Sequence, residues 1–412
     1  PYTVLSKRMN NHIPQIFENL GVQTFFQDML DTKDADFSPI EPLLKEVHWK
    51  YTAEIIKAAY VAAGTDNLYP VFISSFRCAP DSFAIDYFKQ IMERHKKPYL
   101  VLELDEHDSN VGYETRVEAA VRAFENHTLS QKSIKAPLLE QLHPKYAKDI
   151  GQKTVIFPNW DTFAGNLIVS IFKKEGYSAY LMEESRETLK KSILTNTGQC
   201  IPLNAVAAGF INTVEKNGLD PAQCVLWLNH SEIACNIKLY PYHIKQIITD
   251  HGKGFEHSQI YKGELSLFDL SFSASTHAYF AYMFGGLLRS IGCKIRPYEV
   301  RKGETDKALH NALQILCHAF ENSLSKEDAL QYAIALLTKV ETRHEDRPKV
   351  GIFGDLYVRD NDIMNQDLVR FIEDQGGEVI TTPYYKYLKI IANSYFKKWF
   401  KEGRYVSLIS NS

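Results

Sequence analysis

Apolar runs and segments with helical spacing alternate along the chain, and this alternation predicts parallel β-sheets. The runs Pro70–Phe76 and Pro98–Leu104 are typical of buried strands, and a helix is expected to begin between them near Asp81. A second helix, Tyr113–Asn126, follows the later run. Strand, helix and strand in this order form the βαβ unit, in which the connecting helix returns the chain so that both strands run parallel. We therefore predict an α/β domain over residues 1–130.

The same alternation restarts twice after polar linkers. A lysine-rich stretch at 127–152 precedes a second domain, predicted over residues 150–340. Its expected strands are Lys153–Phe157, Tyr177–Met182 and Cys224–Leu228, and its expected helices are Trp160–Gly176, Ala205–Asn217 and long stretches within 264–303 and 307–340. A third α/β segment is predicted over 348–412, with strands Lys349–Phe353 and Glu378–Thr382 around a helix at Asn365–Gln375. The predicted fold class is α/β, with two to three Rossmann-like parallel-sheet domains and a helical insert.

Composition narrows the class of protein. The 412 residues are 45% hydrophobic and 24% charged, which is typical of globular domains and excludes disordered, collagen-like and coiled-coil chains. The formal net charge is −3, so the chain lacks the excess of positive charge that is typical of nucleic-acid-binding proteins. We therefore expect no nucleic-acid partner. No uncharged apolar run approaches about 18 residues and no signal peptide opens the chain, so we expect no membrane span and a cytoplasmic location. Because the chain starts at Pro1 without methionine, we expect it to be a piece of a longer protein.

The six cysteines divide into two groups by their sequence context. Three lie in predicted regular elements or, for Cys293, at a predicted strand start, and are expected to be small buried hydrophobes: Cys224, Cys293 and Cys317. The other three lie just beyond regular elements, where a thiol can reach a metal: Cys78, Cys200 and Cys235. Their wide spacing matches no local metal motif, and the chain contains no C-x-x-C. From spacing alone, metal binding and a structural role both remain open for these three.

Several polar residues directly follow predicted strands: Cys78, Asp105 to His107, Asn159, Asn229 with His230, and Asp355. Ligands of parallel sheets bind beyond the carboxyl ends of the strands, so this convergence predicts a site between the α/β domains, with Cys200 and Cys235 nearby. The acidic run Asp105-Glu106-His107 fits either a metal site or the cap of the following helix. Neither a P-loop nor a dinucleotide fingerprint occurs, and no catalytic residue is assigned.

Several segments together resemble one family: Phe72–Phe83, Leu102–His107, Gly112–Arg116, Asn196–Cys200, Cys235 with Tyr240-Pro241, Arg296–Glu299, Gly303–Asp306, Gly354–Arg359 and Asn365–Arg370. Over almost its whole length the chain resembles the large acyl-CoA dehydratase activase-related proteins. Full chains of that family carry an ATPase domain ahead of modules related to 2-hydroxyacyl-CoA dehydratase subunits. The segment after Pro1 resembles an internal segment of that family's full-length chains, which agrees with the expectation that this chain has a truncated start.

The resemblance implies iron–sulfur chemistry. Related subunits hold a cluster with three cysteines from separate segments, and the matching residues here are Cys78, Cys200 and Cys235, as ligands of a [4Fe–4S] or a double-cubane cluster. The implied function is an electron-transfer or reductase module that receives electrons from the ATPase domain of the same full-length chain, so ATP acts only through that missing domain. The alternatives are a non-catalytic docking module and a dehydratase-like enzyme acting on 2-hydroxyacyl-CoA thioesters. Related subunits pair, which implies a homodimer.

Overall fold

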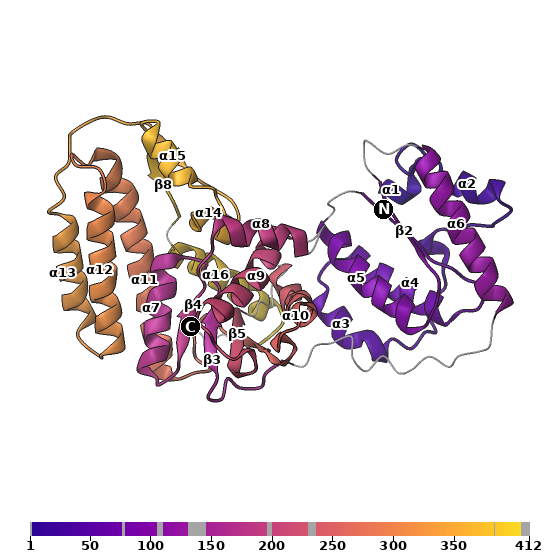
Figure 1. Cartoon of the computed structure of the whole chain (residues 1–412), viewed down its shortest axis with the longest axis horizontal. Helices are drawn as coiled ribbons and strands as arrows, with labels where there is room; N and C mark the ends of the chain where they lie inside the picture. The colour runs from indigo at the N-terminus through magenta and orange to yellow at the C-terminus, as the bar shows by residue number, and fades with distance from the viewer. Residues whose placement is uncertain are drawn as a thin grey trace. The chain divides into compact units, whose positions relative to one another are not determined.

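A computed structural model describes residues 2–75, 79–104, 110–130, 146–195, 200–229, 236–382 and 384–404. The chain forms two compact units, which are described separately (Figure 1). The first contains Pro1–Lys145 and Thr197–Cys200, and the second contains Tyr146–Asn196 and Ile201–Ser412. Both are mixed α/β with parallel strand pairs, which confirms the predicted fold class at that level.

The first unit is built on a parallel strand pair. β1 (Val71–Ser75) and β2 (Leu100–Leu104) align from Val71 opposite Leu100 to Ser75 opposite Leu104, and the predicted strands are confirmed. The connecting helix begins at Ala79, two residues before the predicted start. The helices of this unit are α1 (Tyr2–Leu5), α2 (Ile13–Asn19), α3 (Glu41–Glu46), α4 (Lys50–Gly64), α5 (Ala79–Arg94) and α6 (Asn110–Leu129), with short 3-10 turns at Gln27–Met29 and Ser38–Ile40.

The second unit contains a four-stranded parallel sheet with the order β4-β3-β5-β6. The strands are β3 (Thr154–Phe157), β4 (Ala179–Leu181), β5 (Cys224–Asn229) and β6 (Gln259–Gly263). From β3 the chain crosses through a helix to β4 on one side, and from β5 it crosses to β6 on the other. The strand order therefore reverses between β3 and β5, which is the point where ligands bind in doubly wound sheets. β6 lies in a stretch for which no element was predicted.

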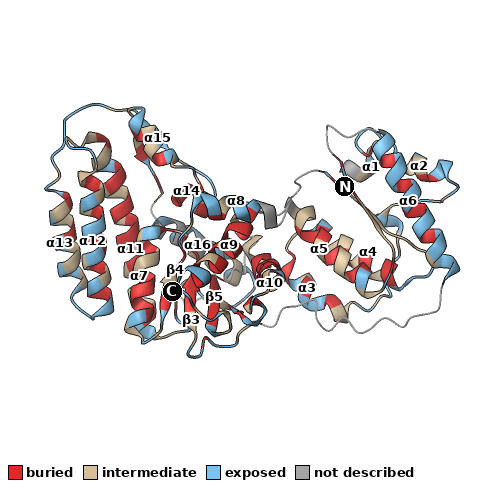
Figure 2. Cartoon of the chain, in the orientation of Figure 1, coloured by how far each residue is buried: buried red, intermediate tan, exposed pale blue. Residues whose placement is uncertain are grey.

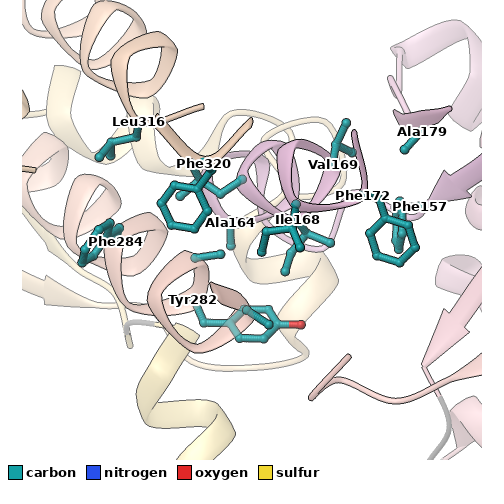
Figure 3. Packing of buried hydrophobic residues seen from close by; sticks show 14 of the residues in the cluster. Phe157, Ala164, Ile168, Val169, Phe172, Ala179, Tyr282, Phe284, Leu316 and Phe320 are labelled. Carbon is teal, nitrogen blue, oxygen red and sulfur yellow. The ribbon is translucent and has the colours of Figure 1, made fainter. Parts of the chain in front are cut away.

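The helices of the second unit are α7 (Thr162–Lys174), α8 (Arg186–Thr195), α9 (Ile201–Lys216), α10 (Tyr240–His251), α11 (Phe272–Ile295), α12 (Glu304–Glu321) and α13 (Lys326–Leu337), with 3-10 turns at Pro221–Gln223, Asn236–Leu239 (η4), Phe255–His257 and Arg296–Tyr298. The buried residues of α12 recur along one side of the helix, as expected for an amphipathic helix on a core (Figure 2). The rings of Phe284 on α11 and Phe320 on α12 lie 6.1 Å apart, near Ala164 of α7 (Figure 3). These contacts join the helical layer to the sheet through one core.

The third predicted segment belongs to the second unit. β7 (Lys349–Gly351) and β8 (Glu378–Ile380) pair in parallel, and the helices are α14 (Leu356–Asp360), α15 (Leu368–Asp374) and α16 (Tyr384–Lys401). A small core joins this part to α11, where Cys293 packs with Val369 and Val379. Both strands are two residues shorter than the sequence predicted.

Candidate functional site

The three predicted cluster ligands share a position relative to helices. Each is the residue immediately before a described element in the sequence: Cys78 precedes α5, Cys200 precedes α9 and Cys235 precedes the 3-10 turn η4, which is followed by α10. Helix N-termini lower the pKa of nearby thiols because their free N–H groups favour the thiolate, which is the form that binds iron. Cys200 is half-buried and groups with the first unit. Cysteine thiolates are the donors that iron–sulfur clusters take, and Cys200 is the one of the three that the structure describes.

The structure does not describe Cys78 and Cys235, nor the acidic run Asp105–His107. Among the described residues, no group of three or more His, Cys, Asp or Glu side chains gathers as metal ligands would. The predicted ligand set and its place between the domains therefore stay predictions.

The other three cysteines lie within strands or helices and are buried or half-buried. Cys224 in β5 is fully buried, and this burial raises the pKa of its thiol to about 11. Cys293 is buried within α11 rather than at the predicted strand start, and burial raises the pKa of its thiol as well. Cys317 on α12 is half-buried, and burial again raises its thiol pKa. Since a buried neutral thiol is a poor metal ligand, the interpretation of these three as packing residues is supported.

A small aromatic cavity lies at the reversal of strand order. Its volume is about 40 Å³. It is lined by Phe157 at the end of β3, Trp160 after β3, Trp227 and Asn229 near the end of β5, and Tyr282 from α11. The space suits a few waters or a small group rather than a large ligand. Asn159, predicted as a site residue, and Asp161 follow β3 at this same edge.

Asp161 caps the N-terminus of α7 and also binds a side chain from α11. It is the N-cap residue, and its Oδ1 accepts a hydrogen bond of 2.8 Å from the amide of Ala164. Its Oδ2 accepts a bond of 2.6 Å from Nε of Arg289 on α11, and both side chains are buried. Burial opposes the charge of Arg289, but the carboxylates of Asp161 and Asp360 outweigh it and raise the guanidinium pKa. The pair thus fixes α11 to the carboxyl edge of the sheet.

Glu184, three residues after β4, is the second acidic group at this edge. Its Oε1 accepts a hydrogen bond of 2.8 Å from the Tyr357 hydroxyl, and its Oε2 accepts one of 3.2 Å from Nδ2 of Asn159. Burial raises the pKa of Glu184, and these neutral donors only partly offset the effect. Burial and the Glu184 carboxylate raise the pKa of Tyr357 well above its ordinary value. Among the described residues at this edge, the Asp161 carboxylate is therefore paired with a guanidinium, whereas the Glu184 carboxyl is hydrogen-bonded by neutral donors.

Sequence reasoning identified Asn159 and Asp355 near this edge but missed Glu184, Arg289 and Tyr357. Asp161 lies two residues beyond Asn159, before a helix, so its capping role was open to prediction. No local pattern links residue 184 to residue 357.

No family model matches the chain, and no curated protein or solved structure matches it significantly. Within the described residues, no helix is long and apolar enough to cross a membrane.

Proposed function

We propose that the chain is the iron–sulfur electron-transfer module of an ATP-dependent acyl-CoA dehydratase activase-like protein. Cys78, Cys200 and Cys235 are the ligands, and the cluster is of the [4Fe–4S] or double-cubane type. Such a cluster, when bound, accepts and passes on single electrons at low potential. ATP acts through a domain outside this chain, because the sequence contains no P-loop.

The main support for this proposal is that the six cysteines fall into two groups by their position in the sequence and in the fold. In the sequence, each of the three predicted ligands directly precedes a described helix or 3-10 turn, and Cys200 precedes α9, whose N-terminal N–H groups favour a thiolate. The other three lie within β5, α11 and α12, where burial favours the neutral thiol.

The test is anaerobic analysis of iron and sulfide in the full-length protein. We expect absorbance near 400 nm and loss of iron and sulfide in Cys78→Ser, Cys200→Ser and Cys235→Ser. Cys317→Ser is the matched control, since Cys317 is half-buried like Cys200 but lies inside α12. Equal iron content in all four variants, or none in the parent protein, contradicts the proposal and favours the docking module.

A further inference from the structure

A short segment of the third α/β part packs on the carboxyl edge of the four-stranded sheet. We define the cover segment as Asp355–Asp367, which contains α14 and the turn that follows it. The Tyr357 hydroxyl bonds Glu184 beyond β4, and Nδ2 of Asn361 donates to the backbone oxygen of Asn159 beyond β3 over 3.2 Å. The Tyr357 ring meets the Trp160 ring edge-on, with centroids 5.0 Å apart. The cover segment therefore lies over the ends of β3 and β4, beside the reversal of strand order.

The cover segment keeps its own shape through internal bonds. Arg359 pairs with the neighbouring Asp360 through Nε at 2.8 Å and Nη2 at 2.6 Å. Oδ1 of Asn361 accepts from the amides of Ile363 and Met364, and Nδ2 of Asn365 donates to the backbone oxygen of Arg359. These bonds join residues within the segment, so they persist if the segment moves as one piece.

Within the part of the second unit that the structure describes, few side-chain hydrogen bonds join the cover segment to other elements. Besides those of Tyr357 and Asn361, Arg186 donates to Asp367 over 2.7 Å at an exposed position, and Arg359 donates to the backbone oxygen of Thr382 over 3.3 Å. Its buried side chains are mostly polar: Tyr357, Arg359, Asp360, Asn361 and the apolar Met364. Polar contact surfaces of this kind are typical of parts that separate, whereas permanent contacts are more apolar.

Both ends of the cover segment carry left-handed backbone. Gly354 has φ of +134°, which L side chains rarely adopt, and Gln366 and Asp367 have φ of +58° and +61°. Two consecutive non-glycine residues in this region are strained, and strain of this kind collects at moving parts. The segment is thus a self-contained piece between two joints.

We propose that Asp355–Asp367 is a hinged cover that opens, as one piece, the carboxyl edge of β3 and β4 at the reversal of strand order. Opening exposes the Glu184 carboxyl, the Asn159 amide and the Trp160 ring, while the Asp161–Arg289 pair stays with the sheet. Because ligands of doubly wound sheets bind at this edge, the cover controls access to it. This inference does not depend on the cysteines or on a cluster.

The test is hydrogen–deuterium exchange of the whole chain, read by mass spectrometry on peptides from 355–367 and from α7. We expect the cover amides to exchange faster than those of α7, by local opening that needs no unfolding of the unit. Tyr357→Phe removes one buried hydrogen bond and should speed cover exchange about tenfold. Tyr282→Phe is the matched control: its hydroxyl also donates a buried bond, to the backbone oxygen of Leu265, but lies outside the cover.

Arg186→Gln provides a variant that cannot compromise the core, because the Arg186 side chain is 74% exposed. It should also raise exchange of 355–367, by a smaller factor, and leave α7 unchanged. The inference is overturned if the cover amides exchange only together with α7. It is equally overturned if Tyr357→Phe and Arg186→Gln leave cover exchange at the parent rate.

Discussion

Gly285 sets how closely α11 approaches α7, and its replacement by alanine tests the packing beneath the carboxyl edge. A Cβ atom added at Gly285 would lie 2.6 Å from the backbone nitrogen of Ala164 and 2.8 Å from its Cα. Backbone atoms cannot rotate away, so the two helices must separate by roughly 0.8 Å to restore ordinary contact. That separation also pulls on the amide of Ala164, which donates to the cap residue Asp161.

The expected cost of Gly285→Ala follows from three effects. Alanine in a helix interior is favoured over glycine by about 1 kcal/mol. Overpacking costs about 1–3 kcal/mol, and contact with backbone places this site at the upper end. Weakening the N-cap bond costs up to about 1 kcal/mol more. We therefore expect a net loss of about 2 kcal/mol, and a fall in melting temperature of roughly 6 °C.

Gly209→Ala is the matched control, because Gly209 is also a buried helix-interior glycine of the same unit. Its added Cβ would meet the Met182 sulfur at 3.1 Å, and this flexible thioether yields by a few tenths of an ångström. We expect stability within about 1 kcal/mol of the parent. The assay is urea unfolding followed by circular dichroism, with linear extrapolation. The reasoning fails if Gly285→Ala is as stable as the parent, or if Gly209→Ala costs as much.

Other expectations concern the ionisable groups. Asp161→Ala leaves a guanidinium buried without its partner and should cost about 3–5 kcal/mol in urea unfolding, whereas Asp367→Ala breaks an exposed pair and should cost less than about 1 kcal/mol. Because the folded pKa of Glu184 is raised, its contribution to stability is complete below its unfolded pKa and falls as pH rises through the folded value. Glu184→Gln should therefore flatten the dependence of melting temperature on pH above the ordinary pKa of glutamate, and an unchanged slope would count against this. In the native protein, Cys200 should react with a thiol reagent at least about tenfold faster than Cys224, as peptide mapping would show.

Strands that consist of a run of apolar residues between turns could be predicted from the sequence. β5 is an example. Its first five residues are all buried, so it reads as a continuous apolar run. β6 escaped prediction because it is an edge strand with the sequence Gln-Ile-Tyr-Lys-Gly, in which only Ile260 and the terminal glycine are buried. Its strand conformation comes from pairing with β5, not from its own pattern.

The candidate site could be predicted only where the place of a single residue in the sequence indicates its place in the sheet. Asn159 follows a strand, and the rule for parallel sheets places such residues at the ligand-binding edge. Its partners could not be found in this way, because Glu184 and Tyr357 are 173 positions apart and meet only after both α/β parts have packed. The chemistry of a hydrogen-bonded group depends on such partners as much as on its own type.

Asp161 and Glu184 lie at the same edge of the sheet, and their different hydrogen-bond partners give them different roles. Asp161 meets a guanidinium and a helix N-terminus, so its charge is matched by groups that belong to the sheet and its helices. Glu184 meets the hydroxyl of Tyr357 and the side-chain amides of Asn159 and Asn361, and burial raises its pKa. The ion pair therefore holds the fixed part of the edge together, whereas the carboxyl group whose pKa is raised by burial is the one that binds the cover segment. Ionisation of Glu184 acts on the contact between cover and sheet, which is the contact that has to break for the edge to open.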